Sequence, residues 1–133
     1  MTWIKTISYE EAKGKLLNLY DRVKGPGNNV DNVMLAHSLR PHTMEGHMAL
    51  YKYVLHHPKN IIPKWFLEAA GVYTSLLNKC DYCVEHHFAG MTRLLKNNKL
   101  AEKIRFVLES QNLSDAFNIK EIEALSYVKK LTE

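Results

Sequence analysis

The chain contains two cysteines, Cys80 and Cys83, three residues apart. Two cysteines placed at random would show this spacing in roughly one or two chains per hundred of this length, so the spacing is itself a chemical signal. Residues three apart on a helix lie close enough for a disulfide. Near a helix start, the unpaired N–H groups and the positive end of the helix dipole favour a thiolate. The pair therefore predicts a redox-active dithiol.

A histidine and a glutamate stand at spacings that could activate these thiols. If Cys80 defines zero on a helical wheel, Cys83 falls at about 300° and His87 at about 340°, so the three share one face. Glu68 is twelve residues before Cys80, about 18 Å away along one continuous helix. A turn near Asn78 would let Glu68 approach His87, giving the order carboxylate, imidazole, thiol of an activated nucleophile.

The elements that must position these residues are helices, because the apolar side chains recur with helical period almost throughout and no segment alternates long enough for a strand. We predict an all-α fold, a helical bundle. The expected helices cover residues 9–24, 31–38, 41–57, 63–77, 78–96, 101–109 and 119–131.

Three helix starts carry capping signals. Ser8 followed by Glu11 forms a capping-box pattern for the first helix, and Asn118 with Glu121 forms the same pattern for the last. Asn78 is the expected N-cap of the helix that carries the cysteines, with Asp81 in its first turn. Breaks between helices are single turns, which predicts one domain over residues 1–133.

Composition narrows the function classes. Of the 133 residues, 46% are apolar and 24% charged, which is typical of a globular domain, and the formal charge of +4 has no long run of like charges. Nucleic acid binding is therefore unsupported and we expect no nucleic acid partner. The N-terminus has no secretory pattern and no apolar stretch reaches the length of a membrane span. Two cysteines are too few for a secreted disulfide scaffold, so a reducing, cytoplasmic location is expected, with no membrane contact.

Other interpretations of the same residues remain open. The cysteines could be buried and inert, or Cys80, Cys83 and His87 could bind zinc in a non-enzymatic helical module. Tyr82, between the thiols, could border a substrate pocket or simply pack. The remaining histidines have simpler explanations: a surface or interface position for His86, capping of carbonyls at a helix end for His56 and His57, and a segment that is mainly core for His37, His42 and His47.

The pattern Glu68-x11-Cys80-x-x-Cys83-x3-His87 resembles the core motif of the AhpD-like alkylhydroperoxidases, within the carboxymuconolactone decarboxylase superfamily. The surrounding residues 78–87 and the upstream segment from Val33 to Pro41 resemble the peroxidase-related branch. The resemblance covers most of the chain, from about residue 3 to residue 131.

The resemblance implies an all-helical subunit that forms trimers or hexamers and reduces organic hydroperoxides or hydrogen peroxide without a cofactor or metal. It implies that Cys83 is the peroxidatic thiol, which becomes a sulfenic acid, and that Cys80 is the resolving thiol. His87 would take the Cys83 proton, through a water, with support from Glu68. An external dithiol, a lipoyl or thioredoxin-like protein, would return the disulfide to the reduced state. A dithiol–disulfide relay protein is the alternative that uses the same pair.

The chain departs from the family pattern at two points. Founding members carry a histidine between the cysteines, where this chain has Tyr82, so a relay through that imidazole is absent. Many members of the peroxidase-related branch continue for several tens of residues beyond the position of Glu133. Either another subunit covers the surface that those C-terminal helices complete, or the chain is a shortened form.

Overall fold

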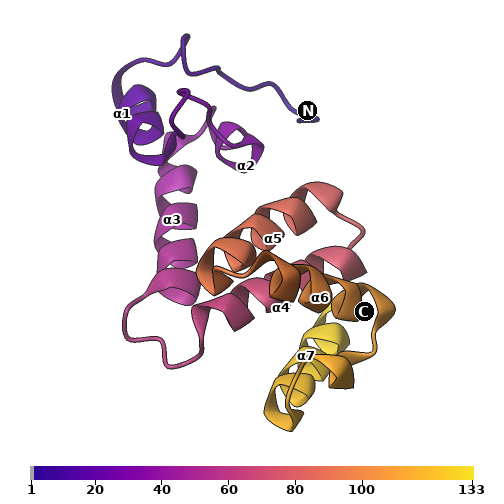
Figure 1. The fold of residues 1–133 in the computed structure, drawn as a ribbon. Helices are drawn as coiled ribbons and strands as arrows, with labels where there is room; N and C mark the ends of the chain where they lie inside the picture. The colour runs from indigo at the N-terminus through magenta and orange to yellow at the C-terminus, as the bar shows by residue number, and fades with distance from the viewer. Residues whose placement is uncertain (1) are drawn as a thin grey trace. The chain divides into compact units, whose positions relative to one another are not determined.

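The computed structural model describes residues 2–133, and these form seven α-helices and no strand (Figure 1). The all-α class predicted from the sequence is confirmed. The chain divides into two compact units, the first ending at Val54 and the second covering Leu55–Glu133. The division falls within a helical segment, η1 (Lys52–His56), so no loop linker marks it. The single domain expected from the absence of linkers stays a prediction.

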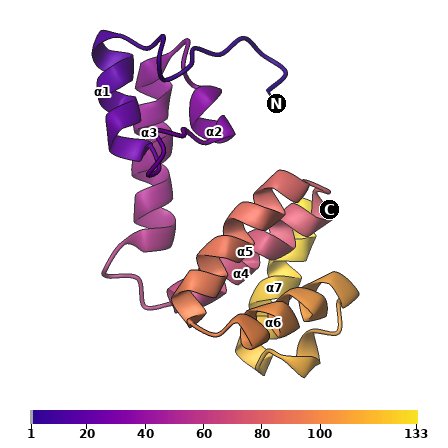
Figure 2. The same ribbon diagram turned by 45° about the horizontal axis from the view of Figure 1, so that its top comes forward.

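The first unit contains α1 (Gly14–Val23), α2 (Asn32–Leu35) and α3 (Pro41–Tyr51). Helices α1 and α3 pack side by side, as Figure 2 shows. The core between these elements consists of Ala12, Leu16, Leu19, Tyr20, Met34 and Met44. The structure thus confirms a helix in each of the first three expected segments, but α2 is half the expected length and α3 gives way to the π-helical η1 from Lys52 onward.

The predicted start of the first helix is wrong. Ser8 and Glu11 do make both hydrogen bonds of a capping box, the Ser8 N–H donating to Glu11 Oε2 and the Glu11 N–H to Ser8 Oγ. They close an isolated turn, however, because Lys13 is extended and Gly14 adopts a positive φ of 54°. The helix begins only at Gly14, five residues later than expected.

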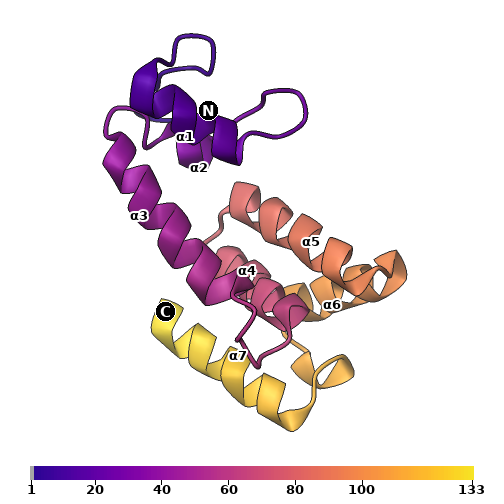
Figure 3. The ribbon, with the colours of Figure 1, turned by 90° about the vertical axis from the view of Figure 1, so that its left-hand side faces the viewer.

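The second unit contains α4 (Lys64–Leu77), α5 (Asp81–Leu95), α6 (Asn98–Ser110), a short 3-10 turn η2 (Leu113–Asp115) and α7 (Ile119–Thr132). Helix α4 lies between α5 and α7 (Figure 3), and it also contacts α6. The core of the second unit is one cluster, to which all four helices and the η2 region contribute. It consists of Phe66, Ala69, Val72, Tyr73, Val84, Met91, Ala101, Ile104, Val107, Leu108, Phe117 and Leu125.

Side chains at the helix surfaces reinforce this arrangement. Arg105 on α6 forms ion pairs with Glu85 of α5 and with Glu109, each at 2.8 Å, and its guanidinium lies 4.9 Å from the centre of the Phe88 ring. At the start of α7, Asn118 and Glu121 complete the capping box predicted from the sequence. Among residues 2–133, no helix has both the length and the apolar character that crossing a membrane requires.

Candidate functional site

A tight turn between α4 and α5 sets the position of the first cysteine. The Cys80 N–H donates to the Ser75 carbonyl and the Lys79 N–H to the Leu76 carbonyl, with Lys79 in the left-handed conformation at a φ of 55°. These are the two bonds of a Schellman motif, which ends α4. Asn78 belongs to this helix end, where its Nδ2 donates to the Thr74 carbonyl.

The predicted N-cap of α5 is therefore wrong. Cys80, not Asn78, is the N-cap residue, and Asp81 is the first residue of the helix. The error has a physical cause, since the sequence could not show that Asn78 and Lys79 would both be used to terminate α4. Cys80 completes the end of one helix and begins the next, so the backbone holds it between two regular elements.

The two thiols lie together at the start of α5. The Sγ atoms of Cys80 and Cys83 are 2.7 Å apart, both cysteines are free and both are partly exposed. The proximity predicted from their spacing is thus confirmed. Because the sulfurs already face each other, an oxidant could join them without unfolding the turn.

The electrostatic setting of Cys83 is opposite to the one expected from a helix start. Burial, the hydrogen bond with Cys80 and the adjacent Cys80 charge raise the pKa of Cys83 to about 11. The favourable effect of the helix N-terminus is outweighed because burial of the sulfur, together with the adjacent Cys80 sulfur, disfavours the thiolate form of Cys83. Cys83 is consequently a thiol at neutral pH, and its reactivity depends on a group that can remove its proton.

Glu68 and His87 meet between α4 and α5. The two helices form an antiparallel hairpin, so Glu68, one turn into α4, lies beside the middle of α5. His87 Nδ1 lies 2.8 Å from Glu68 Oε2, and only 3% of Glu68 is exposed. The contact predicted from a turn near Asn78 is confirmed. A carboxylate oxygen can only accept, so Nδ1 carries the proton and Nε2 is the nitrogen left to act as a base.

Two glycines make this contact possible. A Cβ atom at Gly71 would lie 2.6 Å from His87 Nδ1, and a Cβ atom at Gly90 would lie 2.9 Å from the carboxyl carbon of Glu68. Each glycine is three residues after the functional residue on its own helix and leaves space for the functional residue of the other helix. Neither glycine was predicted from the sequence to be part of the site. The i,i+3 spacing does, however, place Gly71 on the same helix face as Glu68, and Gly90 on the same helix face as His87.

The thiol pair and the carboxylate–imidazole pair are not joined directly. Within residues 2–133, hydrogen bonds connect Cys80 to Cys83 and Glu68 to His87, and none connects His87 to either sulfur. The described residues also contain no group of three His, Cys, Asp or Glu side chains arranged to hold a metal ion. The three zinc ligands considered in the sequence, Cys80, Cys83 and His87, do not converge on one point.

Tyr82 lies next to the thiols in sequence but packs on His86. The ring centroids are 4.2 Å apart, and His86 Nδ1 lies 3.0 Å from the Tyr82 carbonyl oxygen. Tyr82 is also partly exposed. Its suggested role at a substrate pocket stays a prediction.

A further histidine, which was not predicted from the sequence to be a site residue, lies near Glu68. His56, at the end of η1, places Nε2 3.8 Å from Glu68 Oε1, the carboxylate oxygen that His87 does not use. No sequence pattern predicts this contact, because a loop of irregular backbone separates His56 from α4. Its neighbour His57 accepts a hydrogen bond at Nδ1 from the Lys59 backbone N–H.

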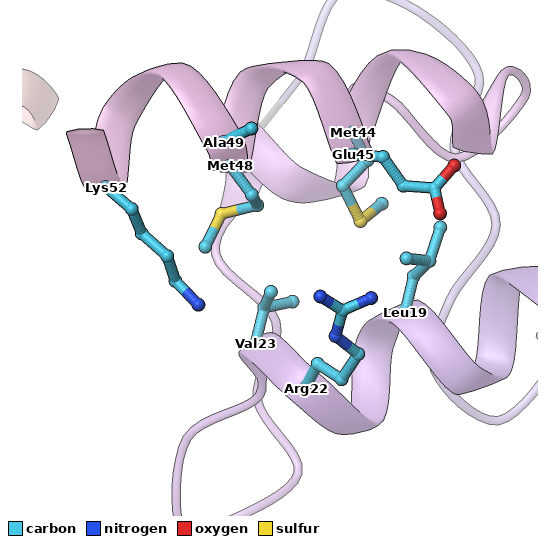
Figure 4. Close-up of a pocket in the computed structure, with 8 residues that line it drawn as sticks. All are labelled: Leu19, Arg22, Val23, Met44, Glu45, Met48, Ala49 and Lys52. Atoms are coloured by element: carbon cyan, nitrogen blue, oxygen red, sulfur yellow. The ribbon is translucent and has the colours of Figure 1, made fainter. Parts of the chain in front are cut away.

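The first unit contains a separate pocket of about 160 Å³, drawn in Figure 4. Residues of α1 and α3 and Lys52 line it: Leu19, Arg22, Val23, Met44, Glu45, Met48, Ala49 and Lys52. None of the predicted site residues is among them.

Elsewhere in the first unit, the His37 and His47 rings lie 5.1 Å apart. Burial lowers the pKa of His47.

No family model, no curated protein and no solved structure matches this chain. Support for a function of this chain therefore comes from the geometry of the α4–α5 hairpin and from the motif resemblance.

Proposed function

We propose that this protein is a thiol-dependent hydroperoxide reductase of the AhpD-like type. The observation that carries the proposal is the 2.7 Å separation of the Cys80 and Cys83 sulfurs, at the start of the helix whose His87 contacts Glu68. A near dithiol, a base and a carboxylate that orients the base are the groups a thiol peroxidase needs.

The first chemical step is attack of the Cys83 sulfur on the peroxide. The thiolate forms an S–O bond as the O–O bond breaks, giving Cys83 sulfenic acid and the alkoxide, which takes a proton and leaves as an alcohol. With hydrogen peroxide, the leaving product is water. Cys83 is assigned to this step by the resemblance, since proximity alone does not rank the two sulfurs.

His87 supplies the base that this step requires. The raised pKa of Cys83, about 11, leaves little thiolate at neutral pH. His87 Nε2 accepts the proton, through a water because no direct contact joins the two residues, and Glu68 stabilises the imidazolium that results. The same imidazolium can return the proton to the departing alkoxide.

The second step forms the disulfide. The Cys80 thiolate attacks the Cys83 sulfenic sulfur and displaces hydroxide, which is protonated to water, so the dithiol loses two electrons in total. A second dithiol, on a lipoyl or thioredoxin-like protein, then reduces the disulfide by exchange. The substrate class we propose is organic hydroperoxides together with hydrogen peroxide.

Assembly into a homo-oligomer belongs to the same proposal. The second unit exposes several large apolar side chains, among them Phe106, Ile119, Tyr127 and Leu131, each with more than half of its surface accessible. Large exposed apolar side chains mark interaction surfaces in many proteins. Trimers or hexamers are the assemblies that the resemblance implies.

A dithiol–disulfide relay is the second candidate function, because the same sulfur–sulfur proximity supports exchange with a partner protein. The zinc-binding module has less support, since Cys80, Cys83 and His87 form no group arranged to hold a metal ion among the residues that the structure describes. Zinc content of protein purified without added metal checks this last possibility.

The test of the proposed function is a count of free thiols, with intact mass, before and after one equivalent of cumene hydroperoxide is added to reduced, metal-free protein. We expect both thiols to disappear rapidly, with loss of the mass of two hydrogens. Thiols that persist, or that oxidise no faster than free cysteine, would contradict the peroxidase proposal. Rapid exchange with an oxidised dithiol protein under the same conditions would then favour the relay.

A further inference from the structure

We propose that His56 is a positioning residue for the Glu68–His87 pair and thereby supports the proton transfer from Cys83. This inference rests on the proposed function for its effect on the reaction. Its structural content, an imidazole that holds the second oxygen of the Glu68 carboxylate, can be tested without any peroxidase activity.

The geometry places the Glu68 carboxylate between two imidazoles. Oε2 lies 2.8 Å from His87 Nδ1, and Oε1 lies 3.8 Å from His56 Nε2. The first distance is that of a hydrogen bond, and the second is a longer polar contact. The two histidines come from different elements, His87 from α5 and His56 from η1, so they hold the carboxylate from two directions.

Burial explains why a second partner matters. The Glu68 side chain is 4% exposed, whereas His87 is 25% exposed and His56 36% exposed. A buried carboxylate is costly unless it is paired. His87 Nδ1 reaches only Oε2. His56 Nε2 faces Oε1, so each oxygen of the buried carboxylate has an imidazole nitrogen beside it.

The second partner also restricts the rotation of the carboxylate. A carboxylate bonded at one oxygen can still turn about its terminal torsion, which is broad for glutamate. On the opposite helix, the space that a Cβ of Gly90 would occupy is filled by the Glu68 carboxyl group, with Oε1 2.9 Å from that Cβ position. His56 lies on the Oε1 side of this carboxyl group, and it keeps Oε2 directed at His87.

The experiment compares His56→Gln, which keeps an N–H donor at similar reach, with His56→Phe, which keeps a flat ring but has no donor. The first measurement is the proton NMR signal of the His87 Nδ1–H, shifted downfield by its bond to a carboxylate and assigned by its loss in His87→Gln. We expect this signal in the unsubstituted protein and in His56→Gln, and its broadening by solvent exchange in His56→Phe.

The second measurement is the rate of thiol loss with cumene hydroperoxide. His56→Phe removes the polar group beside Oε1 and is expected to slow the reaction by about threefold to fivefold, the upper range for a partly exposed polar pair. His56→Gln should recover most of the rate, which loss of packing alone would not explain. His42→Phe, at an exposed position on α3, is the control and should leave both the signal and the rate unchanged.

Thermal unfolding of each variant shows whether the second unit is intact, and His56→Leu replaces His56→Phe if the aromatic ring prevents folding. A His56→Phe or His56→Leu variant that folds and retains the sharp Nδ1–H signal would overturn the proposal. Absence of that signal from the unsubstituted protein would overturn it as well, since there would be no pair to position. If the signal responds as expected but the thiols of neither the unsubstituted protein nor the variants are oxidised by the hydroperoxide, the positioning role of His56 is supported and the peroxidase proposal fails.

Discussion

At the turn of the α4–α5 hairpin, backbone hydrogen bonds place Cys80. Farther along the hairpin, two glycines, which have no side chain, let the two helices approach each other closely. The Schellman bonds of Lys79 and Cys80 use no side chain. The Glu68–His87 contact, in contrast, needs the space that Gly71 and Gly90 leave open. The thiol end should therefore tolerate changes of side chain in its turn, and the carboxylate end should not tolerate even a methyl group.

The largest effect is expected at the thiol end, from the sulfurs themselves. Cys83→Ser should abolish hydroperoxide consumption, because the serine hydroxyl cannot form the sulfenic acid. Cys80→Ser should allow one turnover and leave a trapped sulfenic acid, detectable with dimedone by mass spectrometry. Full multi-turnover activity of Cys83→Ser would remove Cys83 from the reaction.

At the carboxylate end, Glu68→Gln should slow thiol oxidation by about tenfold to a hundredfold, the range for loss of a hydrogen bond to a charged group. The amide keeps an acceptor but cannot neutralise the His87 imidazolium, so the midpoint pH of Cys83 alkylation should also rise. Glu85→Gln, an exposed carboxylate on α5 that pairs with Arg105, is the control. An unchanged rate and pH profile in Glu68→Gln would exclude Glu68 from the mechanism.

A direct test of the packing at this end is Gly90→Ala. The new methyl group would meet the Glu68 carboxyl group at 2.9 Å, and overpacking of this kind costs about 1–3 kcal/mol. Gly46→Ala, in α3, has open space around the new methyl group, so it should be stabilising by about 0.5–1 kcal/mol. Urea unfolding of both variants checks the contrast, and equal stability of the two would show that the helices can separate freely.

The pH dependence of stability separates the two ends further. Folding raises the pKa of Cys83 from 9.0 to about 11, so the folded state binds more protons than the unfolded state in that interval and stability falls as pH rises through it. Burial also raises the pKa values of Tyr20 and Tyr73, which act in the same direction. The difference between the unsubstituted protein and Cys83→Ser isolates the thiol, and an equal change of the urea midpoint between pH 8 and pH 10.5 in the two proteins would contradict the raised pKa of Cys83.

The smallest effect is expected from the turn itself. Lys79 adopts a φ of 55°, which costs a side-chain-bearing residue about 1–2 kcal/mol relative to glycine. Lys79→Gly relieves this cost but loses about 0.5–1 kcal/mol through the freedom of glycine in the unfolded chain. A net stabilisation of about 0.5 kcal/mol, with unchanged thiol oxidation, is therefore expected from thermal unfolding. A marked loss of oxidation rate would mean that the Lys79 side chain takes part in the site.

Sequence reasoning predicted those parts of the hairpin that depend on periodicity and local spacing. The helical faces, the proximity of Cys80 to Cys83 and the approach of Glu68 to His87 all follow from angles along a helix and one turn. The capping signals were less reliable. Asn118 begins a helix as expected, yet the same pattern at Ser8 closes only a turn, because Gly14 three residues beyond the box takes a left-handed conformation.

The remainder of the site depends on contacts that have no sequence period. The approach of His56 to Glu68 depends on the path of residues 57–63. The pKa of Cys83 depends on how deeply its sulfur is buried and on which atom lies nearest to it, and a helical wheel gives neither. The roles of Cys80, Cys83, His87 and Glu68 in peroxide reduction stay predictions until the thiols are titrated.

The dual position of Cys80 restricts the length of the chain at the hairpin turn. Its N–H completes the end of α4 and the residue caps α5, with only Asn78 and Lys79 between the helix and the cysteine. One inserted residue would force Cys80 to abandon one of these two places, and would turn α5 by about 100° relative to α4. Insertions and deletions should therefore be absent from this turn in any functional relative.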